Sequence, residues 1–369
     1  MTPPGRDSNI AAVSRHNQTH HSLAAPYGQY VPAVEVTRGS VVESVHSAAI
    51  AVADHRGTVV ARLGGVDHVV FLRSSAKPIQ AMAVVESGAM EKFGLTLREL
   101  AVMAGSHSSE PEHLEAVTGI LAKIGLDPSH LHCGTHTPFS KAVAERYVRQ
   151  GRALTAVEHN CSGKHAGMLA AALAGGHETS NYLSQRHPVQ QRILGILAEM
   201  TGRIRDRIIV AVDGCGAPTL GVTLSEAARA FARLMSPDGL AEGHGEAASR
   251  VVSAMREHPG MVAGVEMLDT ELTGWPSPKI ISKRGAEGVQ CAAFAGGQGP
   301  PVACGIAAKV ADGNDGRARA ALLMETLRQL DVLAGKELAR LTASAALVIR
   351  SNSGRDVGLV RPAFTLQRA

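Results

Sequence analysis

The sequence predicts a mixed α/β (α+β) fold whose β-sheet is assembled from both ends of the chain, with a mainly helical lobe inserted between them. β-Branched residues are frequent in residues 31–72, and strand-like runs return in residues 279–310. Helical patterns dominate residues from about 97 to 260. With 369 residues, of which 45% are hydrophobic, the chain can bury one large core or two closely packed ones.

The N-terminal strand region leads directly into the first expected helix. Three glycine-containing turn signals divide residues 31–72 into a meander of three or four strands. In residues 77–92 apolar side chains recur with roughly helical spacing, and Pro78 suits a first helical turn. Ser74 is therefore expected at or near the N-terminus of this helix.

Periodicity divides the rest of the chain into a helical middle and a mixed C-terminal part. Helices are expected at residues 98–103, 112–124, 141–149, 164–173, 189–200, 224–235 and 247–257. The Ile- and Val-rich run 207–212 predicts a buried strand among them. Further strands are expected at 279–282, 289–294 and 302–310, then a helix at 317–333, and an irregular stretch after Ser351.

Composition favours a cytoplasmic protein that acts on a small molecule. A net charge of +4 and only 3% aromatic residues argue against nucleic-acid binding. Five widely spaced cysteines fit reduced thiols better than a disulfide framework. Residues 1–28 are polar and lack the apolar core of a signal peptide, so we expect a flexible tail. Residues 29–369 are expected to form a single catalytic domain with two lobes, the helical lobe spanning about 97–260, and no membrane span is expected.

A Ser-x-x-Lys pattern places a hydroxyl and an amine on one face of a helical turn. Ser74 and Lys77 have this spacing, which serine β-lactamases and penicillin-binding proteins also use. A lysine activates a serine only where burial or nearby cations lower the pKa of its amine. The alternative is an N-capping serine followed by an exposed lysine.

Two further segments carry polar side chains in glycine-containing turns. Residues 103–110 include Ser106 and carry more hydrogen-bonding side chains than a purely structural turn requires. The neighbouring Ser108 or Ser109 could instead cap the next helix. Lys283 follows an expected strand and is a second candidate lysine for the site. The alternative interpretation is that this turn is the solvated end of a hairpin.

Two thiols and an amine form the candidate metal site. Cys161 and Lys164 are one helical turn apart, and Cys215 follows Asp213 after an apolar strand. Thiolates bind zinc well, whereas lysine must first lose its proton. The alternative is a pair of inert, buried cysteines.

In this order, five sequence blocks resemble the Rhizobium etli-type, or class 3, L-asparaginases. They are Arg73-Ser-Ser-Ala-Lys-Pro78, Gly105-Ser-His107, His159-Asn-Cys-Ser-Gly-Lys-His165, Val212-Asp-Gly-Cys-Gly216 and Lys283-Arg-Gly-Ala-Glu-Gly288. The resemblance covers nearly the whole chain after the tail. It implies a homodimer with a fold similar to serine β-lactamases and glutaminases.

The resemblance also implies a role for each candidate residue. It pairs Ser74 with Lys77 and Ser106 with Lys283, for which Lys279 is the fallback. It implies zinc held by Cys161, Lys164 and Cys215, and a substrate pocket lined by Arg73, His165 and Asp213.

We therefore hypothesise that one of the two serines attacks the side-chain amide of L-asparagine, giving L-aspartate and ammonia through an acyl-enzyme. The sequence does not decide between the serines. Alternatives are a glutaminase or a penicillin-recognising hydrolase, a cysteine hydrolase using Cys161 and His165, and a non-enzymatic protein that binds zinc or an amino acid.

Overall fold

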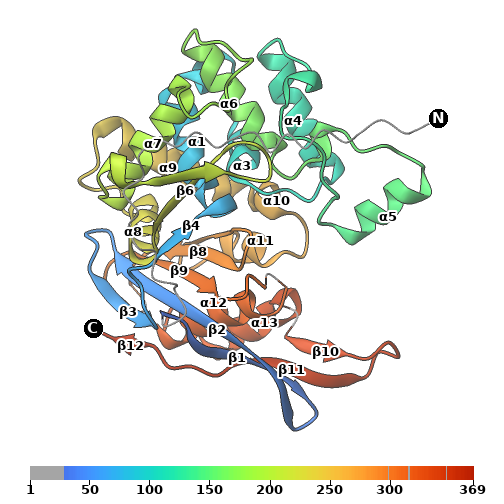
Figure 1. Ribbon diagram of the computed structural model, residues 1–369, viewed down its shortest axis with the longest axis vertical. Coiled ribbons are helices and arrows are strands. Elements are labelled where there is room, and N and C mark those ends of the chain that lie inside the picture. The colour runs from blue at the N-terminus through green and yellow to red at the C-terminus, as the bar shows by residue number, and fades with distance from the viewer. Residues whose placement is uncertain (1–28, 298, 315, 346) are drawn as a thin grey trace, which may run out of the picture.

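A computed structural model describes residues 29–297, 299–314, 316–345 and 347–369, so the expected tail at residues 1–28 lies outside the described residues. The fold is mixed α/β, as predicted. Its main sheet is antiparallel, with the order β10-β11-β1-β2-β9-β8-β7, and β3 joins β2 to β12 at one side (Figure 1). The strands are β1 (Val31–Arg38), β2 (Val41–Asp54), β3 (Val59–Leu63), β7 (Ile280–Arg284), β8 (Val289–Phe294), β9 (Cys304–Val310), β10 (Val348–Arg350), β11 (Asp356–Pro362) and β12 (Gln367–Arg368).

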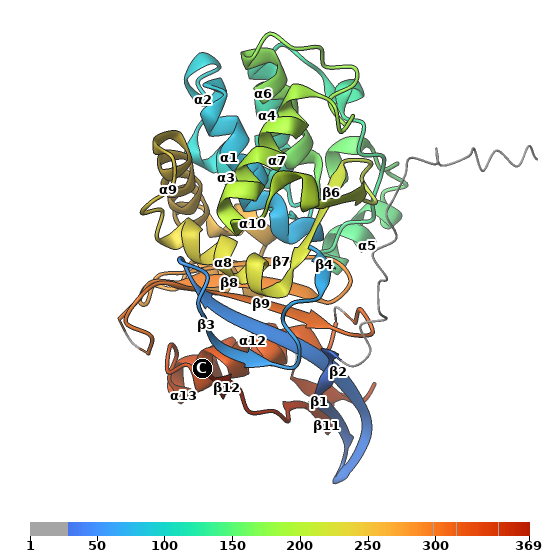
Figure 2. The same cartoon turned by 60° about the vertical axis from the view of Figure 1, so that its left-hand side comes forward.

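The central strands are buried on both faces because the sheet lies between two helical layers. In β2, Ala49, Ala51 and Ala53 belong to one hydrophobic core. The alternate residues of β2, such as Ile50 and Val52, belong to a second core. This period-2 division follows from the pleat, which turns successive side chains to opposite faces. Helices α12 (Ala318–Gln329) and α13 (Gly335–Ala345) cover the second face (Figure 2).

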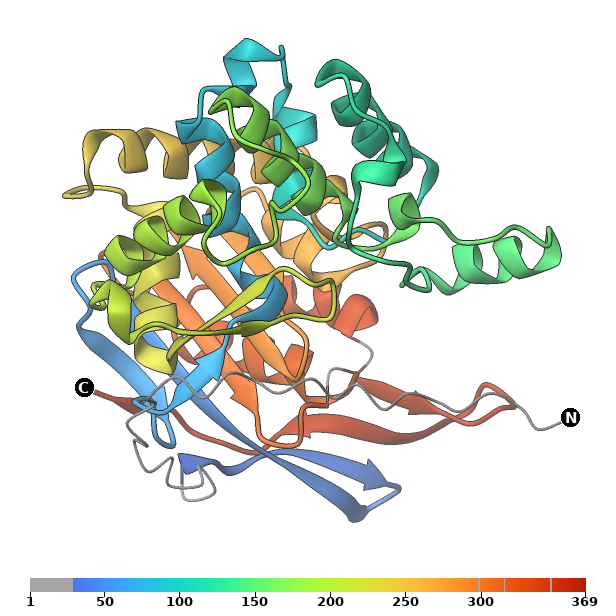
Figure 3. The same cartoon turned by 45° about the horizontal axis from the view of Figure 1, so that its top comes forward.

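The predicted helical lobe covers the first face of the sheet. Helix α8 (Leu224–Met235) packs directly on β2, β8 and β9, and the other helices of this layer lie above or beside it (Figures 1 and 2). They are α1 (Lys77–Glu86), α2 (Ala89–Lys92), α3 (Leu97–Ala104), α4 (Pro111–Lys123), α5 (Lys141–Arg149), α6 (Ser162–Ala174), α7 (Pro188–Thr201), α9 (Glu242–Glu257), α10 (Pro259–Ala263) and α11 (Leu268–Thr273). Helix α5 projects from the side of this lobe (Figure 3).

The strand predicted at residues 207–212 is present at residues 209–212, but the prediction that it is buried is wrong. The structure has β5 (Ile209–Val212) at the edge of a second, three-stranded sheet in the order β4-β6-β5, with β4 (Val69–Phe71) and β6 (Pro218–Thr223). Val212 is 77% exposed. β6 is the buried centre of this sheet, and the Pro and Gly in its sequence hide it from a pattern search.

The prediction of an irregular C-terminus after Ser351 is also wrong. β11 pairs with β1, and Val360 lies opposite Val36. β12 pairs with β3. The partners of these strands come from the other end of the chain, so local sequence carries little trace of the pairing. In the part of the chain that the structure covers, no helix combines the length and apolar character needed to cross a membrane.

Candidate functional site

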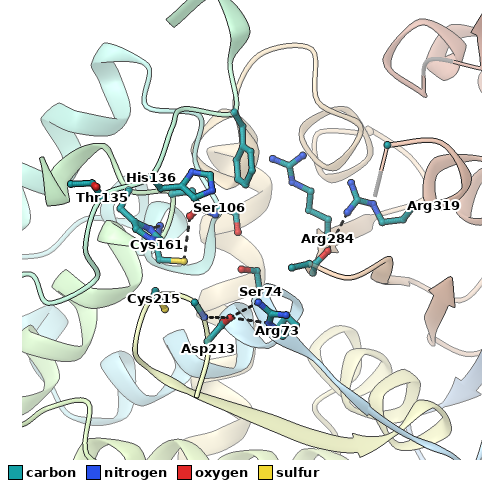
Figure 4. A pocket seen from close by; sticks show the side chains of 17 residues that line it. Arg73, Ser74, Ser106, Thr135, His136, Cys161, Asp213, Cys215, Arg284 and Arg319 are labelled. Atoms are coloured by element: carbon teal, nitrogen blue, oxygen red, sulfur yellow. Dashed lines mark hydrogen bonds and ion pairs between the residues drawn. The ribbon is translucent and has the colours of Figure 1, made fainter. Parts of the chain in front are cut away.

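The candidate site is a pocket of about 560 Å³ between the helical lobe and the end of β7 (Figure 4). Segments that are distant in sequence meet there. Its wall is formed by Arg73, Ser74, Ser106, Thr135, His136, Phe139, His159, Asn160, Cys161, Asp213, Gly214, Cys215, Arg284, Gly285, Ala286, Gly316 and Arg319. The size fits a small-molecule ligand.

Ser106 lies at the centre of a hydrogen-bond network with two lysines. Lys77 is the first residue of α1 and Lys283 lies in β7, yet both amines are 2.9 Å from Ser106 Oγ. Each amine also donates to a backbone carbonyl, that of Asn160 at 3.1 Å for Lys77 and that of Arg284 at 2.8 Å for Lys283. A hydroxyl has one proton, so Ser106 can donate to only one of the two amines while accepting from the other.

Burial makes the neutral form of these lysines accessible. Both side chains are fully buried. Burial lowers the pKa of Lys77. Burial and the neighbouring charge of Lys77 hold the pKa of Lys283 well below its usual range. Both shifts favour the neutral amine, which is the form that can accept a proton from a hydroxyl.

Ser74 lies on the pocket wall, one turn before Lys77. It belongs to the 3₁₀ turn Arg73–Ala76, whose first residue has a φ of 50°, a conformation rarely adopted by a residue with a side chain. Within the described residues the Ser74 hydroxyl has no hydrogen-bond partner, because Lys77 points to Ser106 instead. The Ser106–Lys283 contact implied by the resemblance is present, but a Ser74–Lys77 hydrogen bond is not.

Arg73 and Asp213 form an ion pair at the mouth of the pocket. Arg73 Nε and Nη2 each lie 2.8 Å from Asp213 Oδ1. Asp213 directly follows β5, and the backbone N–H of Gly214 also donates to its Oδ1 at 2.7 Å. Both side chains are partly exposed, so each can also contact a ligand in the pocket.

The three candidate metal ligands lie together beside the pocket. Lys164 Nζ lies 3.0 Å from Cys215 Sγ, and Cys161 is adjacent. A hydrogen bond from Cys215 and the charges of Lys77 and Lys164 hold the pKa of Cys161 well below its usual range. Among the residues with described positions, no group of three His, Cys, Asp or Glu could hold a metal, so a site here needs the lysine amine. The donor set of two thiols and one amine fits zinc.

His165 does not line the pocket. It is fully buried, and its Nδ1 lies 2.7 Å from the Tyr182 hydroxyl. Burial and the charge of Lys164 hold its pKa well below the usual range, which keeps the ring neutral. Its substrate-binding role stays a prediction. The ring makes no hydrogen bond with Cys161 in the described structure, so the arrangement lacks the aligned pair of a cysteine hydrolase.

Several residues of the wall were not singled out from the sequence. Asn160 and Arg284 adjoin predicted residues, and that proximity was the available signal. His136 and Phe139 come from a loop, and Arg319 from the first turn of α12, in each case without a recognisable motif. The Arg284 guanidinium lies 4.4 Å from the centre of the Phe139 ring, which joins two sides of the pocket. The fallback residue Lys279 is exposed, outside this network.

Comparisons with known proteins identify the family. No curated protein sequence matches the chain. Similar solved structures include Mglu in its native form, with 17% identity over 79% of this chain and 67% of that chain and a TM-score of 0.41. Another is a probable glutaminase from Bacillus subtilis complexed with 6-diazo-5-oxo-L-norleucine, with 12% identity, coverages of 77% and 84% and a TM-score of 0.38. A β-lactamase from Burkholderia ambifaria has 14% identity, coverages of 82% and 93% and a TM-score of 0.33. The sequence model for L-asparaginase II matches residues 34–362, and the chain therefore belongs to this family of amidohydrolases.

Proposed function

We propose that the protein hydrolyses the side-chain carboxamide of L-asparagine to L-aspartate and ammonia by a serine–lysine mechanism of the Rhizobium etli type. The observation that carries the proposal is the position of Ser106 Oγ, 2.9 Å from both Lys77 and Lys283, in a pocket that also exposes Ser74. This arrangement supplies two hydroxyls and a neutral amine without a catalytic imidazole.

Ser74 is the nucleophile in this proposal. It lies on the pocket wall near the N-terminus of α1, where backbone N–H groups can stabilise an oxyanion. Its Oγ bonds to the carboxamide carbon while its proton passes to the hydrogen-bond network of Ser106, Lys77 and Lys283. Ser106 then relays a proton to the amide nitrogen, the C–N bond breaks, and ammonia leaves. Water attacks the acyl ester with the proton path reversed, which releases L-aspartate and restores Ser74.

The ion pair at the pocket mouth would select a short zwitterion. Asp213 can pair with the substrate α-ammonium group, and Arg73 with its α-carboxylate. Both groups of an amino acid then lie at a fixed distance from the serines, which favours one side-chain length over another. The difference between asparagine and glutamine is one methylene, so a substrate panel must decide it.

Zinc is part of the proposal as a group that orients the substrate. Cys161 and Cys215 as thiolates and Lys164 as a neutral amine would hold it. When bound, it would supply a Lewis acid beside the pocket. Cys161 lies next to Asn160, whose carbonyl accepts a hydrogen bond from Lys77, so the metal ligands would also fix this lysine.

The direct test measures ammonia release by the purified protein from asparagine and from glutamine, and ring opening of a chromogenic β-lactam by its colour change. Asparagine is expected to be the best substrate, and no release from either amide would contradict the proposal. Ser74→Ala and Ser106→Ala are both expected to lose turnover. Intact-mass spectrometry with an electrophilic asparagine analogue separates their roles. We expect the adduct to persist in the Ser106 variant and to vanish in the Ser74 variant, whereas the opposite pattern would make Ser106 the nucleophile.

A further inference from the structure

A buried carboxylate that the proposed mechanism does not use lies behind the site. Asp269, in α11, is only 3% exposed and does not reach the pocket wall. An isolated buried carboxylate is strongly unfavourable, so its environment must stabilise the charge. The groups that contact Asp269 show which segment of the protein this carboxylate holds in place.

Both oxygens of Asp269 accept hydrogen bonds from the sheet next to Lys283. Oδ1 accepts from Ser282 Oγ at 2.6 Å and from Gln290 Nε2 at 3.0 Å, and Oδ2 accepts from the backbone N–H of Arg284 at 2.8 Å. Ser282 and Arg284 are the residues on either side of Lys283. The carboxylate therefore fixes the strand segment that carries the catalytic lysine.

The charged groups around Lys283 show how the carboxylate of Asp269 affects the protonation of this lysine. Arg284 on β7, and Lys77 on α1 when it is protonated, oppose a positive charge on Lys283, while the carboxylate of Asp269 on α11 and the thiolate of Cys161 favour it. Burial raises the pKa of Asp269, but the positive charges of Lys283 and Arg284 and the hydrogen bond from Ser282 outweigh it, and the net shift is downward. Asp269 is thus ionised at neutral pH.

We propose that Asp269 is a positioning residue that holds Lys283 against Ser106 and stabilises the ammonium form of Lys283 when a proton moves to it through Ser106. The role is similar to that of the carboxylate in a serine protease triad, which orients a base and stabilises its protonated form. Here the carboxylate acts through the strand and through space, because its oxygens are already bonded to Ser282, Gln290 and Arg284. This inference rests on the proposed serine–lysine function.

The test compares Asp269→Asn, which removes the charge with little change of shape, with Ser282→Ala. The second variant removes one hydrogen bond to the carboxylate, and the one that Ser282 Oγ accepts from Gln290, but keeps the charge. The first readout is the titration of the Lys283 amine, followed by ¹⁵N NMR of lysine-labelled protein and assigned with Lys283→Arg. In Asp269→Asn the midpoint is expected to fall by about one pH unit. In Ser282→Ala it is expected to stay within a few tenths of a pH unit.

The second readout is the kinetics on asparagine. Asp269→Asn is expected to reduce kcat by about tenfold or more with KM little changed, since proton transfer is impaired and substrate binding is not. Asp269→Glu keeps the charge and is expected to recover part of the rate. Should Asp269→Asn fail to fold, Asp269→Ser provides a smaller neutral variant with the same expectations.

An unchanged Lys283 titration in a folded neutral variant, or an equal shift in Ser282→Ala, would overturn the inference. The NMR titration needs no substrate, so it separates this inference from the proposed function. Absence of amide hydrolysis by the wild-type protein would instead count against the proposed function alone.

Discussion

Gly105 is the position where one added methyl group should displace the site. It ends α3 and precedes Ser106, and its φ of −93° is open to any residue. An added Cβ would lie 2.4 Å from the carbonyl oxygen of Met261 and 2.9 Å from that of Val262. Both contacts are with backbone, so no flexible side chain can give way. The Ser106 N–H also donates to the Val262 carbonyl at 2.7 Å, so any movement there shifts the serine.

Gly105→Ala is therefore expected to lower stability and activity together. Overpacking of this kind costs about 1–3 kcal/mol. Because 1 kcal/mol lowers Tm by roughly 2–4 °C in domains of 150–250 residues, and by less in longer chains, we expect a loss of a few degrees. A displacement of the Ser106 hydroxyl by about 1 Å would reduce kcat roughly 100-fold.

Thermal unfolding and ammonia release from asparagine measure the two effects. The matched control is Gly195→Ala in α7, where the added Cβ would meet no atom within 4 Å. Replacing glycine by alanine inside a helix is expected to stabilise the protein by about 0.5–1 kcal/mol and to leave activity unchanged. Wild-type Tm and kcat in Gly105→Ala would refute the steric reasoning.

Three further predictions concern the charges of the site. Burial holds the pKa of Lys77 and of Lys283 below the usual value, so both amines take up protons only as the pH falls. Because a protonated amine cannot act as a base, kcat/KM should decrease on the acid side of the pH profile, with the apparent pKa of a coupled pair. A pH profile that is flat on the acid side would contradict a lysine base. Asp213→Asn should raise KM for asparagine about 10- to 100-fold, because a charged hydrogen bond to the substrate, worth about 1.5–3 kcal/mol, is lost. The control substrate is an amide that lacks the α-amino group, for which the same variant should barely change KM. Zinc content by elemental analysis should be near one per chain in the wild type and should drop in Cys161→Ser and Cys215→Ser; equal content in all three proteins would place the metal elsewhere.

The helical lobe was predictable because its helices carry local start signals. Helix α8 occupies residues 224–235 as predicted, and its N-terminus is a capping box of Thr223 and Glu226. The strands that were missed lack such signals. β6 contains Pro218 and Gly221, and β11 becomes a strand by pairing with β1, more than 300 residues earlier. Such pairing depends on the tertiary fold, which propensity does not encode.

The candidate residues of the site were predictable, but their contacts were not. The Ser-x-x-Lys spacing suggested that Ser74 and Lys77 would interact, yet the 3₁₀ turn at Arg73–Ala76 leaves Lys77 pointing to Ser106. Sequence spacing fixes the face of a helical turn on which a side chain starts. It does not fix the partner that a long lysine side chain reaches. Asp269 was invisible in the sequence because α11 has only six residues and no motif.

The burial of two amines around one hydroxyl explains why the site lies at the junction of the sheet and the helical lobe. Each amine loses its hydration on burial and must find partners inside the protein. The carbonyls of Asn160 and Arg284 provide them, because one follows the 3₁₀ turn before α6 and the other ends β7. Neither lobe alone supplies both carbonyls. The two buried amines around Ser106 therefore find their carbonyl partners where the sheet meets the helical lobe, and this requirement links the assembly of the fold to the geometry of the pocket.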